Sequence, residues 1–395
     1  MKTPDEAATL LQAVHRIADI VQCHADEAER NRRLSPPVVS ALADAGLFRM
    51  GLPADLGGIE VSPLTFYRAI EAVATLDGSA GWCAFIGASS AFGGAFLSNE
   101  AAEEIYGRDS RVIMGGSVAP VGKALVRDGG YVVNGRWPYA SGCQHSSWLF
   151  GACHVIDGDR VRLTPAGAPE VRLACVPASS VTILEDTWDV SGLAGTGSHD
   201  FTVDSVYVPE GYTLPFGPGM VRGKHYQGAL YRFPLVGLFR LPTSAVALGI
   251  AQGAVQACMQ LVQSKPAVIG TGVLRDQPLI QARMADAVAL VNSGREWLHA
   301  VLERTWEGTA RGPVSPHQRA ELLLAALNAT RRATEAVQSV YTIAGGSANY
   351  RRSSLQRSLR DIQAVTQHVG MAPQQYEEAG RMLLGLDSLQ PLLRL

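Results

Sequence analysis

The sequence of 395 residues has almost no net charge and no organised pattern of cysteines. Lysine and arginine number 34 and aspartate and glutamate 36, so the formal net charge is only −2. This balance gives no electrostatic reason to expect binding to nucleic acid or to an anionic membrane. The six cysteines show neither a CxxC spacing nor a paired arrangement, and no secretory signal precedes the first polar helix. We therefore expect reduced thiols and a cytoplasmic protein.

The motifs of several common enzyme classes are also missing. The sequence has no GxxxxGK[ST] phosphate loop, no HExxH pair and no GxSxG turn, and the run Gly192–Gly197 has the wrong spacing for a dinucleotide fingerprint. The nine histidines are scattered, and none pairs at the spacing of metal ligands, so we expect no metal site. No apolar run reaches the roughly 18 residues that a membrane span requires. Kinases, simple hydrolases and metalloproteases therefore find no support.

The spacing of the hydrophobic residues changes along the sequence and predicts three domains. Hydrophobic residues make up 47% of a chain too long for one ordinary core. Apolar residues recur at helical spacing at about 4–33, 38–45, 63–76 and 78–97. From Arg111 onward, short β-like runs alternate with turns, as in a compact antiparallel barrel or sandwich.

Helical periodicity returns near Pro234 and predicts an antiparallel four-helix bundle. Its segments are expected at about 234–264, 277–305, 316–344 and 354–385. The predicted fold class is therefore mainly α with a central β domain. The predicted domains are an N-terminal all-helical domain, a small β domain and a C-terminal four-helix bundle, at residues 1–110, 111–215 and 216–395.

Several segments resemble the acyl-CoA dehydrogenase fold. Asn134-Gly135 with Trp137–Gly142 is similar to the strand that passes the flavin ring in that fold, and Gly195–Asp200 is similar to a later β segment. In the bundle, Ala344-Gly345-Gly346 and Arg360-Asp361 resemble the final helical hairpin. The resemblance covers nearly the whole chain, and it implies that a flavin lies between the β domain and the bundle.

One segment departs from the acyl-CoA dehydrogenase pattern. In those enzymes a glutamate about seven or eight residues past the Arg-Asp pair removes the α-proton of the substrate. The corresponding stretch, Ile362–Gly370, has no carboxylate and contains His368. The next acids, Glu377 and Glu378, lie more than two turns beyond and are typical of a solvated helix face. Loss of the acid with retention of the flavin segments resembles the flavin-dependent monooxygenase branch, the two-component hydroxylases that use reduced flavin.

That resemblance implies an oxygenation reaction. Reduced flavin, FADH2 or FMNH2, would come from a separate flavin reductase and react with O2 to give a C4a-hydroperoxide, which transfers oxygen to the substrate. Low charge and apolar helices favour an aromatic or polycyclic small molecule. The alternatives are an acyl-CoA dehydrogenase or oxidase that desaturates a thioester, an N-oxygenase of an amine, and a flavin-free scaffold. The resemblance also implies a homotetramer or a homodimer.

Two residues are predicted to be catalytic, Ser141 and His368. Ser141 ends the ring-facing strand, where its hydroxyl can bond near flavin N5; a turn serine beside Gly142 is the structural alternative. His368 can accept a substrate proton or donate one to the departing oxygen, because imidazole titrates near neutral pH. The structural alternative for His368 is an ordinary helix histidine.

Other residues are predicted to bind flavin or substrate. The predicted cofactor-binding set is Ser117, Val118, Tyr139, Ser141, Gly142, Thr196, Gly197, Ser198, Arg275, Gly345 and Gly346. A tight turn explains the run at 196–198 equally well, and a helix C-cap explains the glycine pair. The predicted substrate pocket comprises Trp82, Phe85, Phe92 and Ser117. Ordinary core packing is the alternative for the three aromatic residues.

Overall fold

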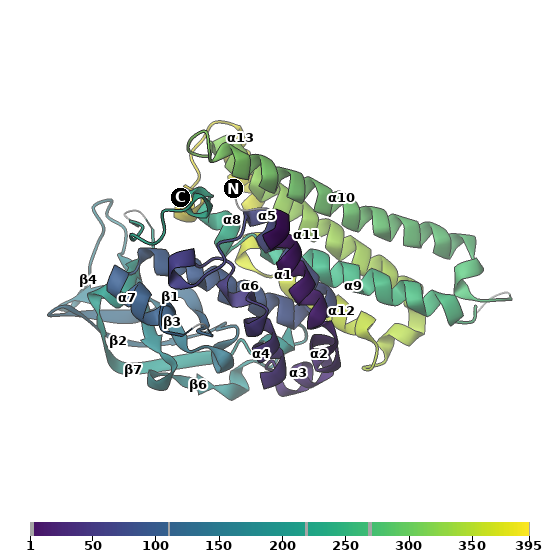
Figure 1. Ribbon diagram of the computed structural model, residues 1–395, viewed down its shortest axis with the longest axis horizontal. Coiled ribbons are helices and arrows are strands. Elements are labelled where there is room, and N and C mark those ends of the chain that lie inside the picture. The colour runs from purple at the N-terminus through teal and green to yellow at the C-terminus, as the bar shows by residue number, and fades with distance from the viewer. Residues whose placement is uncertain (1–3, 110, 218–219, 268–270, 395) are drawn as a thin grey trace.

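The computed structural model describes residues 4–109, 111–217, 220–267 and 271–394, and it shows helices, then a sheet, then helices (Figure 1). This order confirms the predicted fold class. Residue 110, where we place the first domain limit, lies outside the described residues. The first strand begins at Met114 and the last strand ends at Pro215, and the division into three domains at 110/111 and 215/216 stays a proposal.

Among the N-terminal helices, α6 packs against α5, and α1 and α2 pack against α5 in turn. The elements are α1 (Pro4–Arg16), α2 (Ala18–Cys23), α3 (Ala25–Asn31), α4 (Pro36–Asp44), α5 (Pro63–Leu76), α6 (Gly78–Gly93) and α7 (Asn99–Tyr106). The single helix expected over 4–33 is divided into α1, α2 and α3. One break falls at His24, whose Nδ1 lies 2.9 Å from the carbonyl oxygen of Ile20 and competes for that helical acceptor. Helix α6 is buried nearly all round, and the Asp77 side chain caps it by accepting the backbone N–H of Ala80 at 2.8 Å.

The β domain is one eight-stranded sheet in the order β6-β7-β2-β1-β3-β5-β8, with β4 paired to β3. Its strands are β1 (Met114–Arg127), β2 (Gly130–Trp137), β3 (Trp148–Asp157), β4 (Arg160–Val161), β5 (Val171–Pro177), β6 (Thr182–Leu184), β7 (Asp200–Pro209) and β8 (Thr213–Pro215). The sheet has its own core, in which Trp137 stacks on Phe201 at 5.0 Å.

The sheet is not wholly antiparallel as we expected, because β1 and β3 run parallel. The hairpin from β1 to β2 reverses the chain. The chain then crosses to the far side of β1 before it forms β3, so β3 again runs in the direction of β1. All other strand pairs described in the sheet are antiparallel.

The C-terminal helices form the predicted bundle, which extends away from the β domain (Figure 1). They are α8 (Leu235–Phe239), α9 (Thr243–Ser264), α10 (Pro278–Gly308), α11 (Pro316–Ala344), α12 (Ser354–Thr366) and α13 (Gln374–Leu383). By length and composition alone, the stretch Leu235–Ser264 is apolar enough to cross a membrane, and 61% of its most apolar window is buried. Helix α9 packs against α5, α11 and α12, as the core helix of a bundle does.

The fourth predicted bundle segment, 354–385, is interrupted between α12 and α13. Pro373 cannot donate a helical hydrogen bond, and the residue before a proline disfavours helix. The His368 side chain accepts the backbone N–H of Gly370 at 3.2 Å and so caps the short turn Val369–Met371. The interruption places His368 just past the end of α12.

Candidate active site

Ser141 lies where the N-terminal helices meet the β domain. It follows β2 in a turn that contains two left-handed residues, Tyr139 (φ 62°) and Gly142 (φ 72°). A Cβ atom at Gly142 would lie 2.7 Å from the Nε2 atom of His145, so both backbone and space favour glycine there. The backbone N–H of Gly142 donates to the carbonyl of Thr196 at 2.9 Å. This bond joins the Ser141 turn to the turn before β7.

A row of buried hydrogen bonds passes through Ser141. The indole Nε1–H of Trp82, on α6, donates to Ser141 Oγ at 3.0 Å. Ser141 Oγ and Ser198 Oγ are 2.7 Å apart, as are Ser198 Oγ and Thr196 Oγ1. Thr196 Oγ1 donates to the carbonyl of Leu193 at 2.7 Å. The structure thus brings together four of the predicted site residues.

The hydrogen bond from Thr196 to Leu193 selects one arrangement of the protons in this row. Thr196 has a single hydroxyl proton and gives it to Leu193, so it accepts the proton of Ser198. Ser198 must then accept the proton of Ser141, because its own proton is already used. Ser141 therefore keeps one free acceptor position, since it also accepts from Trp82. Toward a ligand, Ser141 presents an acceptor and no donor.

His368 lies on the other side of Trp82. The two rings meet edge to face, with centroids 5.5 Å apart and an interplanar angle of 82°. Nδ1 of His368 accepts from the backbone N–H of Gly370 and lies 3.3 Å from Thr243 Oγ1. In the neutral ring the proton therefore sits on Nε2, and this N–H donates to no acceptor among the described residues.

Burial and a nearby cation both keep His368 neutral. Burial is the larger cause, and the positive charge of Arg240 adds to it, so the pKa of His368 falls to about 4. At neutral pH the ring is thus a hydrogen-bond donor through Nε2. Of its two predicted roles, the geometry favours donation over proton acceptance.

No carboxylate shares a hydrogen bond or ion pair with Ser141, Trp82 or His368 in the part of the chain that the structure describes. Glu377 is exposed. The expected solvated position is wrong for Glu378, whose buried carboxylate accepts from Ser388 Oγ at 2.6 Å and faces the C-terminal segment. The place of the dehydrogenase base is therefore not filled by either acid.

Of the other predicted cofactor residues, Ser117 and Val118 lie on β1, and Tyr139 lies in the turn after β2. Ser117 is buried, and its Oγ accepts the backbone N–H of Ala119 at 3.4 Å. The pairing of β1 with β3 is interrupted between Ser117 and Gly122, which leaves Val118 at 37% exposure. Tyr139 is 70% exposed and meets Trp188 edge to face at 6.2 Å. The predicted flavin segment thus offers apolar groups to solvent.

Two predicted pocket aromatics lie deeper in the helical core. Phe85 is fully buried and supports Trp82 edge to face at 5.8 Å. Phe92 is also buried, and its ring contacts are with Phe66 and Tyr231. Neither residue has a described ring contact with His368, so their pocket role stays a prediction.

Arg275, Gly345 and Gly346 lie together elsewhere, around Lys265 at the end of α9. Nζ of Lys265 donates to the carbonyl of Ala344, and its backbone carbonyl accepts from Leu274. Figure 1 shows the C-terminal end of α9 at the end of the bundle remote from the β domain. Arg275 is exposed and donates to Gln263 at 2.7 Å. Within one chain these residues therefore do not join the Ser141 row, and their binding role stays a prediction.

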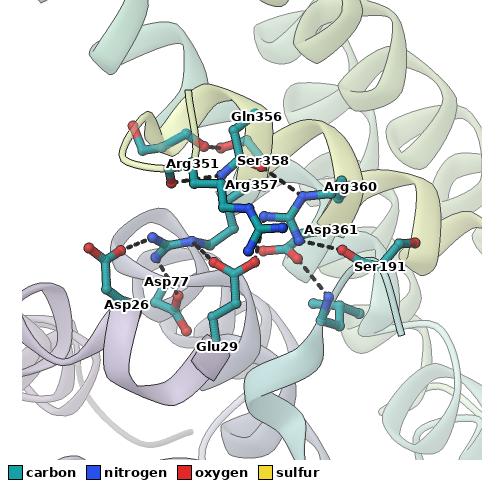
Figure 2. Close-up of polar contacts among 12 residues, drawn as sticks. Asp26, Glu29, Asp77, Ser191, Arg351, Gln356, Arg357, Ser358, Arg360 and Asp361 are labelled. Carbon is teal, nitrogen blue, oxygen red and sulfur yellow. Dashed lines mark hydrogen bonds and ion pairs between the residues drawn. The ribbon is translucent and has the colours of Figure 1, made fainter. Parts of the chain in front are cut away.

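Behind the row, Asp361 joins α12 to the turn that carries Thr196. Its Oδ1 accepts the backbone N–H of Leu193 at 2.6 Å (Figure 2). Burial is the main cause, with repulsion from Asp77, that raises the pKa of Asp361 to about 7. Arg357 pairs with Glu29 at 3.0 Å and approaches Asp77 at 3.9 Å (Figure 2). A cavity of about 240 Å³ borders Asp77 and Asp361, but none of the predicted site residues lines it.

Sequence reasoning missed Arg240 and Thr243, both next to His368. They lie 125 or more positions before it in the sequence, and no motif connects them to it. The described residues contain no cluster of histidine, cysteine and acidic side chains able to hold a metal ion.

Comparisons with known proteins agree with this geometry. The model of the acyl-CoA dehydrogenase N-terminal domain matches residues 4–106, and that of the C-terminal domain matches residues 241–373. An indole-3-acetate monooxygenase of Pseudomonas putida is 35% identical over 92% of this chain and 90% of its own length. The oxygenase subunit HsaA of a flavin-dependent monooxygenase from Rhodococcus jostii is 29% identical, over 92% and 95%. The crystal structure of a 3-HSA hydroxylase from Rhodococcus sp. RHA1 superposes with a TM-score of 0.88 at 27% identity, over 97% and 98%.

Proposed function

This chain belongs to the acyl-CoA dehydrogenase family, in its flavin-dependent monooxygenase branch, and we propose that it is the oxygenase component of a two-component system. A separate reductase would supply reduced flavin, FADH2 or FMNH2. The substrate is an aromatic small molecule, the class on which the similar indole-3-acetate monooxygenase acts by name. We also propose that it works in the cytoplasm as a homotetramer or homodimer.

The direction of the hydroxyl row carries this proposal. In the arrangement selected by the bond from Thr196 to Leu193, Ser141 gives its proton to Ser198 and accepts from a ligand. Reduced flavin has an N–H group at N5, whereas the N5 of oxidised flavin is a bare acceptor. The row therefore fits the reduced form and opposes the oxidised form. The exposed apolar groups of Val118 and Tyr139 suit the face and rim of a flavin ring.

The residues of this chain then prepare the oxygenation. Bound reduced flavin supplies two electrons, so that one atom of O2 enters the substrate and the other leaves as water. Trp82, backed by Phe85, closes the wall between Ser141 and His368 and excludes water there. His368 holds a proton on Nε2, from which it can donate a hydrogen bond to oxygen on the substrate side. The lack of a carboxylate in contact with these groups, among the described residues, favours oxygenation over desaturation of a thioester.

The test mixes the protein with reduced FMN or FAD under anaerobic conditions, then adds O2 and an aromatic substrate. We expect an absorbing species that precedes oxidised flavin, and product labelled by isotopic O2. Direct return to oxidised flavin with quantitative peroxide and no labelled product would refute the proposal. Turnover of an acyl-CoA without any reductant would support the dehydrogenase instead. The position of the label on carbon or nitrogen separates a hydroxylase from an N-oxygenase.

A further inference from the structure

Arg240 is a cation beside the candidate active site that has no carboxylate partner among the described residues. It follows α8 and is half-buried. Its Nη1 donates to the side-chain oxygen of Gln390 at 2.7 Å, the hydrogen bond described for its guanidinium. That guanidinium has five N–H donors in all. Burial lowers the pKa of Arg240, and no described carboxylate opposes this effect.

The other withdrawn arginines of the chain are compensated in different ways. Arg49 donates to backbone carbonyls, and Arg319 donates to the carbonyl of Leu393 and has no ion pair among the described residues. Arg295 binds Glu71 at 2.6 Å, and Arg357 is surrounded by Asp26, Glu29 and Asp77. None of the ion pairs found in residues 4–109, 111–217, 220–267 and 271–394 includes Arg240. A guanidinium withdrawn from water without a counter-ion destabilises the folded state. Arg240 differs from Arg319 in that it lies close enough to His368 to lower its pKa, so an anion that arrives with a ligand at the site can supply the missing charge.

The position of Arg240 places such an anion next to His368. A Cβ atom added at Gly370 would lie 2.5 Å from Cγ of Arg240 and 3.1 Å from Nδ1 of His368. Both side chains therefore pack against the backbone at Gly370. Thr243 joins them again, because its hydroxyl donates to the carbonyl of Arg240 and lies 3.3 Å from His368 Nδ1.

We propose that Arg240 binds the carboxylate of an aromatic acid and so places the ring of that substrate beside Trp82 and His368. This inference rests on the proposed monooxygenase function and narrows its substrate class. A guanidinium forms two parallel hydrogen bonds with a carboxylate, which fixes both position and orientation. The indole-3-acetate monooxygenase that is 35% identical to this chain is named for an acid of this kind.

The test compares aromatic acids with their uncharged amides. Dissociation constants are measured under anaerobic conditions, with and without reduced FMN, for indole-3-acetate, phenylacetate and the two corresponding amides. In the wild-type protein at least one acid should bind at least about 30-fold more tightly than its amide, because the amide leaves the cation unpaired. If neither acid binds more tightly than its amide, the proposal is overturned.

Variants separate this role from a structural one. Arg240→Gln should weaken binding of the preferred acid by at least about 30-fold and leave its amide within about twofold. Arg232→Gln, which removes an exposed charge eight residues earlier, should change neither. Arg240→Gln should keep or raise the melting temperature, because the arginine has no counter-ion in the described part of the folded chain. An equal loss for acid and amide, with a lower melting temperature, would show that Arg240 only supports the fold.

The second source of an anion is the phosphate of the flavin. If Arg240→Gln weakened binding of reduced FMN but not of reduced riboflavin, the cation would serve the cofactor, and the substrate proposal would fail. The oxygenase function is judged separately, by labelled product and by the species that precedes oxidised flavin. An oxygenase without preference for acids would therefore remain an oxygenase.

Discussion

Substitution of Asp361 by asparagine should change how the stability of this protein depends on pH. The asparagine side chain would keep an oxygen able to accept the N–H of Leu193, but it carries no charge at any pH. In the wild type, burial first and repulsion from Asp77 second raise the pKa of Asp361 from 3.8 to about 7. The carboxyl group of Asp361 is therefore harder to ionise in the folded protein than in the unfolded chain.

The sign follows from the proton count in the two states. Between pH 3.8 and about 7 the folded protein keeps a proton on Asp361 that the unfolded chain has released, so the stability from this group falls as pH rises. The full shift corresponds to at most about 4 kcal/mol, at roughly 1.36 kcal/mol per unit. From pH 5 to pH 8 the stability of Asp361→Asn relative to wild type should rise by about 3 kcal/mol.

The assay is the melting temperature of both proteins, measured every half unit from pH 5 to pH 8. For a chain of this length, about 3 kcal/mol corresponds to roughly 4 °C. The variant should gain on the wild type as pH rises and should keep that gain above pH 7. Two parallel curves, with a constant difference, would refute the assignment of a raised pKa to Asp361.

A second variant tests the cause of the shift. Asp77→Asn removes the repelling charge and keeps a residue able to cap α6, so it should lower the pKa of Asp361 and reduce the pH dependence. Arg357→Gln removes a cation that favours the ionised form of Asp361, so it should make the pH dependence of the stability steeper. If neither variant altered the slope, burial alone would explain the raised pKa.

Three further predictions concern the site itself. His368→Ala should lower coupled product formation by roughly 10²–10⁴-fold while reduced flavin still binds, and the exposed His317→Ala should not; the measurement is product per flavin oxidised. Ser198→Ala frees the proton of Ser141, so the preference for reduced over oxidised flavin should fall by about fivefold; titration with both forms checks this. Trp82→Phe keeps an aromatic ring but removes the N–H that Ser141 accepts, so it should cost about 1 kcal/mol and increase peroxide release, as measured by melting and a peroxide assay.

The fold was predictable because local periodicity decides most of it. Four long segments with helical periodicity after Pro234 are typical of a bundle, and the structure has helices in all four, with the fourth interrupted between α12 and α13. The parallel pairing of β1 with β3 was not predictable from either strand, because it depends on where the chain crosses. The division of the first helix depends on one side chain, His24, whose competing hydrogen bond leaves no mark in hydrophobic spacing.

In the candidate site, too, the residues in recognisable local segments were predictable from the sequence, and those that act through contacts with distant segments were not. Ser141, Thr196 and Ser198 lie in two short segments that resemble a known family, and the structure joins them by direct hydrogen bonds. Arg240 and Asp361 act through contacts with distant segments, the first near His368 and the second with Leu193. An isolated arginine in a sequence does not show whether a carboxylate will face it.

The candidate site depends on three segments that are far apart in the sequence and do not share a backbone element. Trp82 comes from α6, Ser141 from the turn after β2, and His368 from the end of α12. Trp82 contacts both Ser141 and His368, so a small movement of α6 would break its hydrogen bond to Ser141 and its ring contact with His368. The cap of α6, Asp77, faces the charges of α12, and Asp361 of α12 holds the Leu193 turn. Asp77, Arg357 and Asp361, shown in Figure 2, therefore link α6, α12 and the Leu193 turn, at a cost in stability that a purely apolar contact would avoid.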